Sequence, residues 1–223
     1  MASAPSPATF KPPSRPWTQT LTVGSLCLFA ALCATAWAKV NHKPQALQTG
    51  DLIFHTSKSK LSAMIASTTR SPYTHVGVVV IRRGKPWVME AGGRVRWTAL
   101  NRFKARGAMG RYRVRRLKGG LNSAQKRKLK RALGRYLGRP YDIKFRWGER
   151  RIYCSELPWL AYKRGLGLTL AKPQRKGELF QAYNPLLRAY LARYFRRKGP
   201  DLEELIISPA RLFQSESLRD VAQ

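Results

Sequence analysis

The chain has 223 residues, of which 43% are hydrophobic and 10% aromatic, so its composition excludes an intrinsically disordered protein. Its 43 Lys and Arg residues greatly outnumber its 11 Asp and Glu residues, which gives a net charge of +32. A charge of this size attracts polyanions such as nucleic acid, anionic lipid or acidic cell-wall polymers, but a solvated basic surface would have the same composition.

The first 38 residues have the pattern of an export signal. Lys11 and Arg15 precede an uncharged apolar stretch of 18 residues, Leu21–Ala38, which ends in the sequence Ala-Trp-Ala. A basic start, an apolar middle and a small-residue exit are typical of a secretory signal peptide. The stretch is also just long enough to stay in the membrane as a single span. We therefore expect export to the periplasm, and both a cleaved signal and a retained membrane anchor stay open.

The cysteines single out one residue of the folded part. Cys27 and Cys33 lie inside the apolar stretch and each follows a leucine, which excludes a lipoprotein signal. Cys154 is the one cysteine left for the body, so an intrachain disulfide is excluded there. A lone thiol in an exported domain pairs with another chain, lies inert in the core, or reacts.

After a polar connector at residues 39–49, the chain alternates short apolar runs with turn residues. The spacing of Leu61, Met64, Ile65 and Thr68 predicts a helix over Lys60–Thr68. Runs rich in β-branched and aromatic residues predict an antiparallel meander. Its strands are expected at Gly50–Phe54, His75–Ile81, Trp87–Ala91, Val95–Thr98 and Arg111–Val114.

The second half of the body is predicted to be mainly helical. Asn122 or Ser123 is expected to cap a helix whose apolar stripe runs to Leu137, before Gly138 and Pro140 end it. Further helices are expected at Ile152–Gly165, entered near Cys154, and at Leu186–Lys198. We expect a single α+β domain over residues 50–223, with an antiparallel sheet packed on helices.

Cys154 and His75 are the candidates for chemistry. A free thiol is mostly protonated near neutral pH, and a helix start together with a neighbouring imidazolium would favour the thiolate. Glu156 nearby would oppose the thiolate unless it points to solvent. The chain has only three histidines, and His75 opens the strongest predicted core strand. By residue type alone, the pattern favours a buried inert thiol over catalysis.

The order of several motifs resembles a known family. The segments GDLIF, THVGVVV, PWVMEA, YDIKFRW and IYCSEL follow one another as in the YiiX/YebB-like permuted papain-fold amidases. These are relatives of the NlpC-type murein peptidases and of the lecithin–retinol acyltransferase group. The resemblance covers residues 50–215 and implies a circularly permuted papain-like fold, in which the histidine precedes the cysteine.

The resemblance also implies roles for individual residues. Cys154 would be the nucleophile, His75 its base and Glu90 the residue that orients the imidazole. If Gly84-Lys85 forms a two-residue hairpin turn, Glu90 pairs with Val79 and shares a face with His75, whereas a five-residue loop places it on the other face. Asp51 and Asp142 are the alternatives for the third role. Tyr141 is expected to be either a substrate contact or second oxyanion donor, or a core tyrosine.

Three functions are compatible with these residues. The first is an exported cysteine hydrolase that cleaves an amide, as in cell-wall peptides. The second keeps the same site but acts on a lipid acyl group at an anionic membrane surface. The third is a non-catalytic basic protein that binds polyanions. No CxxC or HExxH spacing and no phosphate-binding loop is present, so we expect neither a metal nor a cofactor, and no specific nucleic-acid partner.

Overall fold

The computed structural model describes residues 45–180 and 201–222. These residues lie in one compact unit, His42–Gln223. The predicted export segment and the helix expected at Leu186–Lys198 lie outside the described residues. Among the described residues, no helix has both the length and the apolar character needed to cross a membrane.

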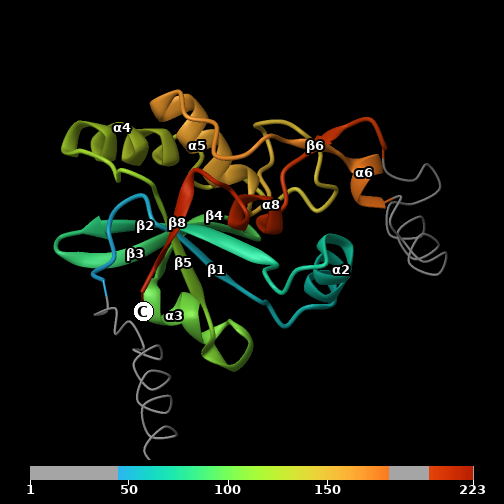
Figure 1. Cartoon of the computed structure of the whole chain (residues 1–223), viewed down its shortest axis with the longest axis horizontal. Helices are drawn as coiled ribbons and strands as arrows, with labels where there is room; N and C mark the ends of the chain where they lie inside the picture. The colour runs from blue at the N-terminus through green and yellow to red at the C-terminus, as the bar shows by residue number, and fades with distance from the viewer. Residues whose placement is uncertain (1–44, 181–200, 223) are drawn as a thin grey trace, which may run out of the picture. The chain divides into compact units, whose positions relative to one another are not determined.

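A six-stranded sheet forms the centre of the fold (Figure 1). Its strands lie in the order β4-β3-β2-β1-β5-β8, and each neighbouring pair is antiparallel. The first four strands along the chain form a meander as predicted, but β5, which was expected to continue it, pairs with β1 instead of β4, and the carboxyl end of the chain adds β8 beside β5. The strands are β1 Leu52–His55, β2 His75–Arg82, β3 Lys85–Gly92, β4 Arg94–Ala99, β5 Arg113–Leu117 and β8 Leu218–Val221.

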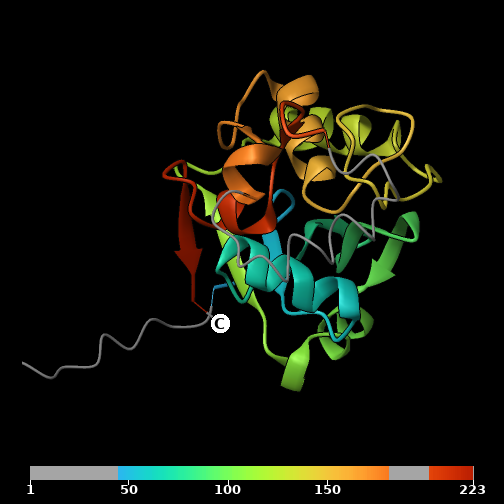
Figure 2. The same ribbon diagram turned by 90° about the vertical axis from the view of Figure 1, so that its right-hand side faces the viewer.

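The two faces of the sheet are covered differently (Figures 1 and 2). Helices α4, Ser123–Gly134, and α5, Glu156–Leu166, pack with Val76 and Val78 of β2 in the larger core. The short helix α3, Leu100–Ala105, covers the opposite face, where Phe103 packs on Val79. Successive side chains of β2 point to opposite faces of the sheet, so they belong alternately to two separate cores.

Local sequence signals explain the helices around the site. Ser59 accepts a hydrogen bond from the backbone N–H of Ser62 and caps helix α2, Lys60–Thr69. Asn122 and Gln125 form a reciprocal capping box at the start of α4. The smaller elements are the 3-10 turn Ala108–Gly110, β6 Gln174–Arg175, α6 Lys176–Phe180, β7 Leu205–Ile206 and α8 Pro209–Phe213.

Two expectations from the sequence need correction. Arg82 pairs with Lys85, so the hairpin turn is Arg83-Gly84, both with positive φ, and not Gly84-Lys85. Val79 therefore pairs with Val88, and Glu90 lies two residues nearer to His75 than expected. Helix α4 ends at Gly134, and Leu137 is 50% exposed, so it does not belong to the buried stripe.

Candidate active site

Cys154 lies in the turn that leads into helix α5. Ser155 is the N-cap of this helix, and its hydroxyl donates to the carbonyl oxygen of Ile207 over 2.7 Å, which fixes the turn against the carboxyl-terminal segment. Pro158 is tolerated because it occupies the first turn, where backbone N–H groups need no partner within the helix. The buried sulfur of Cys154 thus lies at the positive end of the α5 dipole.

His75 and Glu90 are brought together by the register of two neighbouring strands. His75 opens β2, and Glu90 lies on the same face of β3. Nε2 of His75 and Oε2 of Glu90 are 2.6 Å apart, and the Glu90 side chain is fully buried. The other ring nitrogen, Nδ1, is therefore the one that can exchange a proton with Cys154.

Glu90 is held as a carboxylate by two further donors. The hydroxyl of Thr98 donates to Oε1 over 2.5 Å, and the guanidinium of Arg106 donates to the same oxygen. Burial acts to raise the pKa of Glu90. The hydrogen bond and charge of His75, the hydrogen bond from Thr98 and the charge of Arg106 outweigh burial and lower the pKa to about 2. Glu90 therefore stays negative over the whole physiological range.

The thiol and the imidazole form a hydrogen-bonded pair. Burial acts to raise the pKa of Cys154, but the hydrogen bond to His75 and the imidazolium charge hold it below its usual value. Burial acts to lower the pKa of His75, but the hydrogen bonds to Cys154 and Glu90 raise it to about 9. The arrangement thus favours a thiolate–imidazolium ion pair near neutral pH.

Two more groups approach the sulfur. The hydroxyl of Tyr141 lies 4.0 Å from Sγ, and the carbonyl oxygen of Thr74 lies 3.9 Å from it. The structure therefore gathers Cys154, His75, Glu90 and Tyr141 at one place, as predicted from the sequence. Their roles in catalysis remain predictions.

The alternative carboxylates lie elsewhere. Asp51 binds the guanidinium of Arg116 over 2.6 and 2.8 Å. Asp142 accepts from the backbone N–H of Lys144 and from Arg146. Neither aspartate contacts His75 among the described residues, so Glu90 is the carboxylate that forms a hydrogen bond with the imidazole.

Glu156 was expected to oppose a thiolate at Cys154 unless it pointed to solvent. It is instead fully buried, with its carboxyl group accepting from the backbone N–H groups of Gly148 and Tyr153. Burial raises the pKa of Glu156 to about 8. The side chain is therefore mostly protonated at neutral pH and brings little negative charge to the helix start.

Sequence reasoning missed several neighbours of the pair. Thr98 could have been found, because this residue of β4 pairs with Val88 of β3 and so lies on the same face as Glu90. Arg106 follows α3 in an irregular segment that has no periodic signal. His55 lies opposite His75 on β1, with ring centroids 5.1 Å apart. It is buried, neither ring nitrogen has a hydrogen-bond partner among the described residues, and burial lowers its pKa to about 4.

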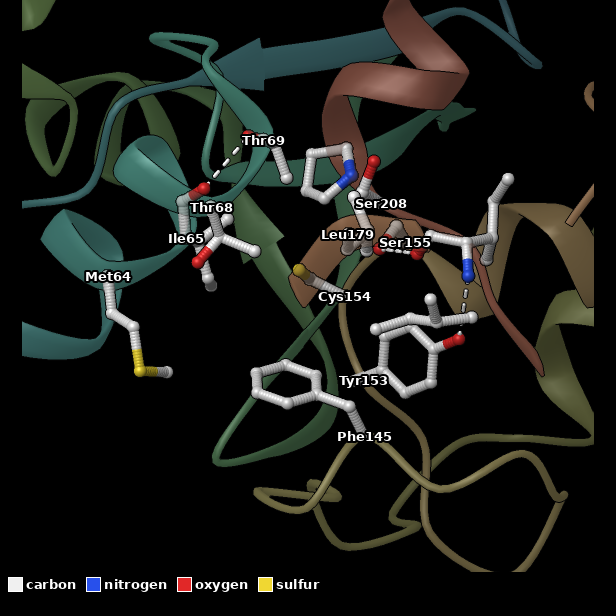
Figure 3. A pocket seen from close by; sticks show the side chains of 13 residues that line it. Met64, Ile65, Thr68, Thr69, Phe145, Tyr153, Cys154, Ser155, Leu179 and Ser208 are labelled. Atoms are coloured by element: carbon white, nitrogen blue, oxygen red, sulfur yellow. Dashed lines mark hydrogen bonds between the residues drawn. The ribbon is translucent and has the colours of Figure 1, made fainter. Parts of the chain in front are cut away.

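Two hollows lie beside the catalytic candidates. The first, which we call the apolar pocket, contains Cys154 in its wall and is a small hollow of about 40 Å³ (Figure 3). The second, which we call the basic cleft, contains His75 in its wall, together with Tyr141, Lys58 and Arg106. Each hollow therefore reaches one member of the Cys154–His75 pair.

Comparisons with known proteins agree with this geometry. Residues 46–221 match a family described as permuted papain-like amidase enzymes, YaeF/YiiX. The chain is 39% identical over 198 residues to YiiX of Escherichia coli strain K12, an uncharacterised protein; the match covers 89% of this chain and 93% of YiiX. A crystal structure described as metalloprotein yiiX from Escherichia coli O157:H7 is 42% identical, with a TM-score of 0.75, and covers 79% of this chain and 97% of that one.

Proposed function

We propose that this chain, which belongs to the family of permuted papain-like amidases, cleaves an amide bond by acyl transfer to Cys154. The fold is the permuted papain-like fold of that family, and a cysteine hydrolase of the amidase type is the activity it implies. The observation that carries the proposal for this chain is the hydrogen-bonded row Cys154–His75–Glu90, because it couples a nucleophile to a base and the base to an orienting carboxylate.

The first half of the reaction forms a thioester. The Cys154 thiolate attacks the carbonyl carbon of the amide, and a tetrahedral intermediate carries the negative charge on oxygen. His75, which holds the proton taken from the thiol, donates it to the nitrogen of the leaving group as the C–N bond breaks. The amine then leaves, and the acyl group stays on sulfur.

The second half releases the acid. His75 takes a proton from water, which attacks the thioester carbonyl, and the C–S bond breaks to return the thiolate and then the ion pair. The backbone N–H of Cys154 is proposed as one donor to the developing oxyanion. The hydroxyl of Tyr141, 4.0 Å from Sγ, is proposed as the second.

The proposed reaction uses only side chains and backbone groups of this chain. The solved relative is described as a metalloprotein. In the part of this chain that the structure describes, no three His, Cys, Asp or Glu side chains come together to hold a metal ion. Both ring nitrogens of His75 are also in use, because one forms a hydrogen bond with Glu90 and the imidazole forms another with Cys154. These residues do not fit a metal site.

We also propose that the enzyme acts outside the cytoplasm, either released into the periplasm or anchored in the inner membrane. The support is the basic start and apolar stretch at residues 11–38. Residues 1–49 fused to an alkaline phosphatase that lacks its own signal would give an active reporter. An inactive reporter, with the fusion protein present in the cytoplasm, would refute export.

Two substrate classes follow from the sequence and remain proposals. A murein stem peptide would place a carboxylate of its leaving group near Lys58 and Arg106 of the basic cleft. An acyl lipid would place its chain in the apolar pocket beside Cys154. The apolar lining of that pocket favours the second class.

The amidase proposal is tested by trapping the acyl-enzyme. The protein is mixed with short N-acyl p-nitroanilides and with murein fragments, quenched, and digested for peptide mass spectrometry. An acyl adduct on the Cys154 peptide that precedes release of the acid supports the mechanism, and Cys154→Ala removes both. Hydrolysis that survives in Cys154→Ala, or failure of every amide to acylate the wild-type protein, would overturn it.

A further inference from the structure

Helix α4 presents its outer side to solvent as a row of basic residues. Its inner side, with Leu129, Ala132 and Leu133, is buried in the larger core, and the helix lies beside α5 (Figure 1). We call the exposed cations of α4 and of its C-cap the basic face. They are Arg127, Lys128, Lys130, Arg131 and Arg135.

No carboxylate neutralises the basic face within the described residues 45–180 and 201–222. Residues 91–141 contain neither Asp nor Glu. The ion pairs of the described part all involve other residues than those of α4. On the adjoining segments, Glu149 is already bonded to Arg164 and Tyr136. The charges of the face therefore repel one another in water, and an anionic surface placed against them would relieve that repulsion.

The basic face is long and straight. Arg127, Arg131 and Arg135 recur at every fourth position, and Arg135 keeps helical backbone angles as the C-cap, so the three lie on one side of the helix. The 12 residues of α4 span about 18 Å. A row of this shape fits an extended, flat partner better than a single small anion.

An exposed apolar side chain at the end of the row favours a lipid bilayer as that partner. Leu137 lies two residues after Arg135 and is 50% exposed. At a membrane surface, such a side chain enters the boundary between the headgroups and the acyl chains while the basic residues stay among the headgroups. The phosphate backbone of a nucleic acid offers Leu137 no comparable apolar contact.

The path of the chain before α4 also favours a bilayer. The ammonium group of Lys126 donates to Oε1 of Gln48 over 3.3 Å, so the connector contacts α4. Only ten residues lead from Ala38, the end of the apolar stretch, to Gln48. Ten residues span at most about 36 Å when fully extended. An apolar stretch held in a membrane would therefore keep α4 close to the membrane surface.

We propose that the basic face of α4 docks on a bilayer that contains anionic phospholipid, with the helix axis parallel to the membrane. This surface is separate from the Cys154–His75 site, and the proposal does not rest on the amidase function. Each basic side chain near an anionic membrane strengthens binding about fivefold. The five residues together would therefore strengthen binding by about 10³-fold.

Acetylation of single lysines tests the docking. The full chain is reconstituted in nanodiscs, treated briefly with N-hydroxysuccinimidyl acetate, and digested for peptide mass spectrometry. Acetylation of Lys128 should fall about fivefold or more when about one third of the phosphatidylcholine is replaced by phosphatidylglycerol, and should recover in about 0.5 M NaCl. Lys58, exposed just before α2, is the internal control and should not change. Insertion of the apolar stretch alone would leave Lys128 equally reactive in both lipids.

Charge-reversal variants locate the effect. Arg127→Glu combined with Arg131→Glu should abolish the protection of Lys128. Arg102→Glu combined with Arg111→Glu is the matched control, because both residues are exposed outside α4 and the change in net charge is the same. Circular dichroism shows whether each variant is folded. The control variant should keep the protection.

The other outcomes overturn the proposal. Equal acetylation of Lys128 in the two lipids refutes docking of the basic face. Loss of protection in the control variant as well would show that total charge, and not α4, brings the protein to the membrane. Equal protection of Lys128 by double-stranded DNA at the same phosphate concentration would replace the bilayer by a nucleic acid as the partner.

Discussion

Glu90→Gln is the most informative single change, because it keeps the shape of the side chain and removes its charge. The pKa of Glu90 is lowered from 4.5 to about 2. That shift corresponds to about 3 kcal/mol of preference for the carboxylate, shared among His75, Thr98 and Arg106. The protein thus keeps a negative charge against the imidazole in a fully buried position.

The geometry predicts how Glu90→Gln would rearrange the site. Arg106 and Thr98 both donate to Oε1, so the amide oxygen of the variant must stay on that side. The amide NH₂ then faces Nε2 of His75 and forces the proton onto Nδ1, which is the nitrogen that should accept the proton of Cys154. Reversal of the tautomer in a catalytic triad costs about 10⁴-fold in kcat. We expect a loss between about 10² and 10⁴-fold here.

The assay is kcat/KM for an acyl p-nitroanilide as a function of pH, with circular dichroism to show that the variant is folded. Glu149→Gln is the matched control, because Glu149 forms a surface ion pair with Arg164. It should leave the rate unchanged. A folded Glu90→Gln enzyme within about threefold of the wild-type rate would refute the orienting role of Glu90.

Three further predictions concern pH and stability. The ion pair exists above the lowered pKa of Cys154 and below the pKa of His75, so kcat/KM should be high at pH 7 and fall near pH 9; a rate that still rises at pH 9 contradicts the pairing. Glu156 holds its proton in the folded state between pH 4.5 and about 8, so stability falls as pH rises through that range. Glu156→Gln should therefore stabilise the protein by up to about 5 kcal/mol at pH 9 and hardly at all at pH 4, as measured by urea unfolding. Asp51→Asn leaves the buried Arg116 charge unpaired and should cost about 3–5 kcal/mol without moving the pH profile of the folded enzyme; an unchanged unfolding midpoint contradicts this.

Much of the fold could be predicted because its strands have strong local signals. The β-branched run that opens at His75 and the returning run at Trp87–Ala91 are confirmed as β2 and β3. The Asn122 cap is confirmed, since both halves of its capping box are present. The predicted end of α4 was wrong. The apolar pattern continues in the sequence up to Leu137, but the helix ends at Gly134 and Leu137 is exposed.

The active site was harder to predict because it depends on register and on segments far apart in the chain. A turn placed one residue too late still put Glu90 on the correct face, since both registers have the same parity. Arg106 and the pocket wall at Ile206 and Ile207 could not be found from local patterns. Ile206 and Ile207 reach the site only because the carboxyl-terminal segment returns to the sheet and to Ser155.

The central claim is that His75 activates Cys154, and the rate of thiol alkylation at Cys154 tests it most directly. Iodoacetamide labelling is followed on the Cys154 peptide by mass spectrometry, so Cys27 and Cys33 do not contribute, with His42→Asn as the control for His75→Asn. We predict that the rate is already maximal near pH 7 and falls more than tenfold in His75→Asn alone. A slow labelling rate that rises only through pH 8.5–9, as for a free thiol, and that is the same in His75→Asn would contradict activation of Cys154 by His75. Salt-sensitive DNA binding by the same protein would then favour a non-catalytic protein that binds polyanions.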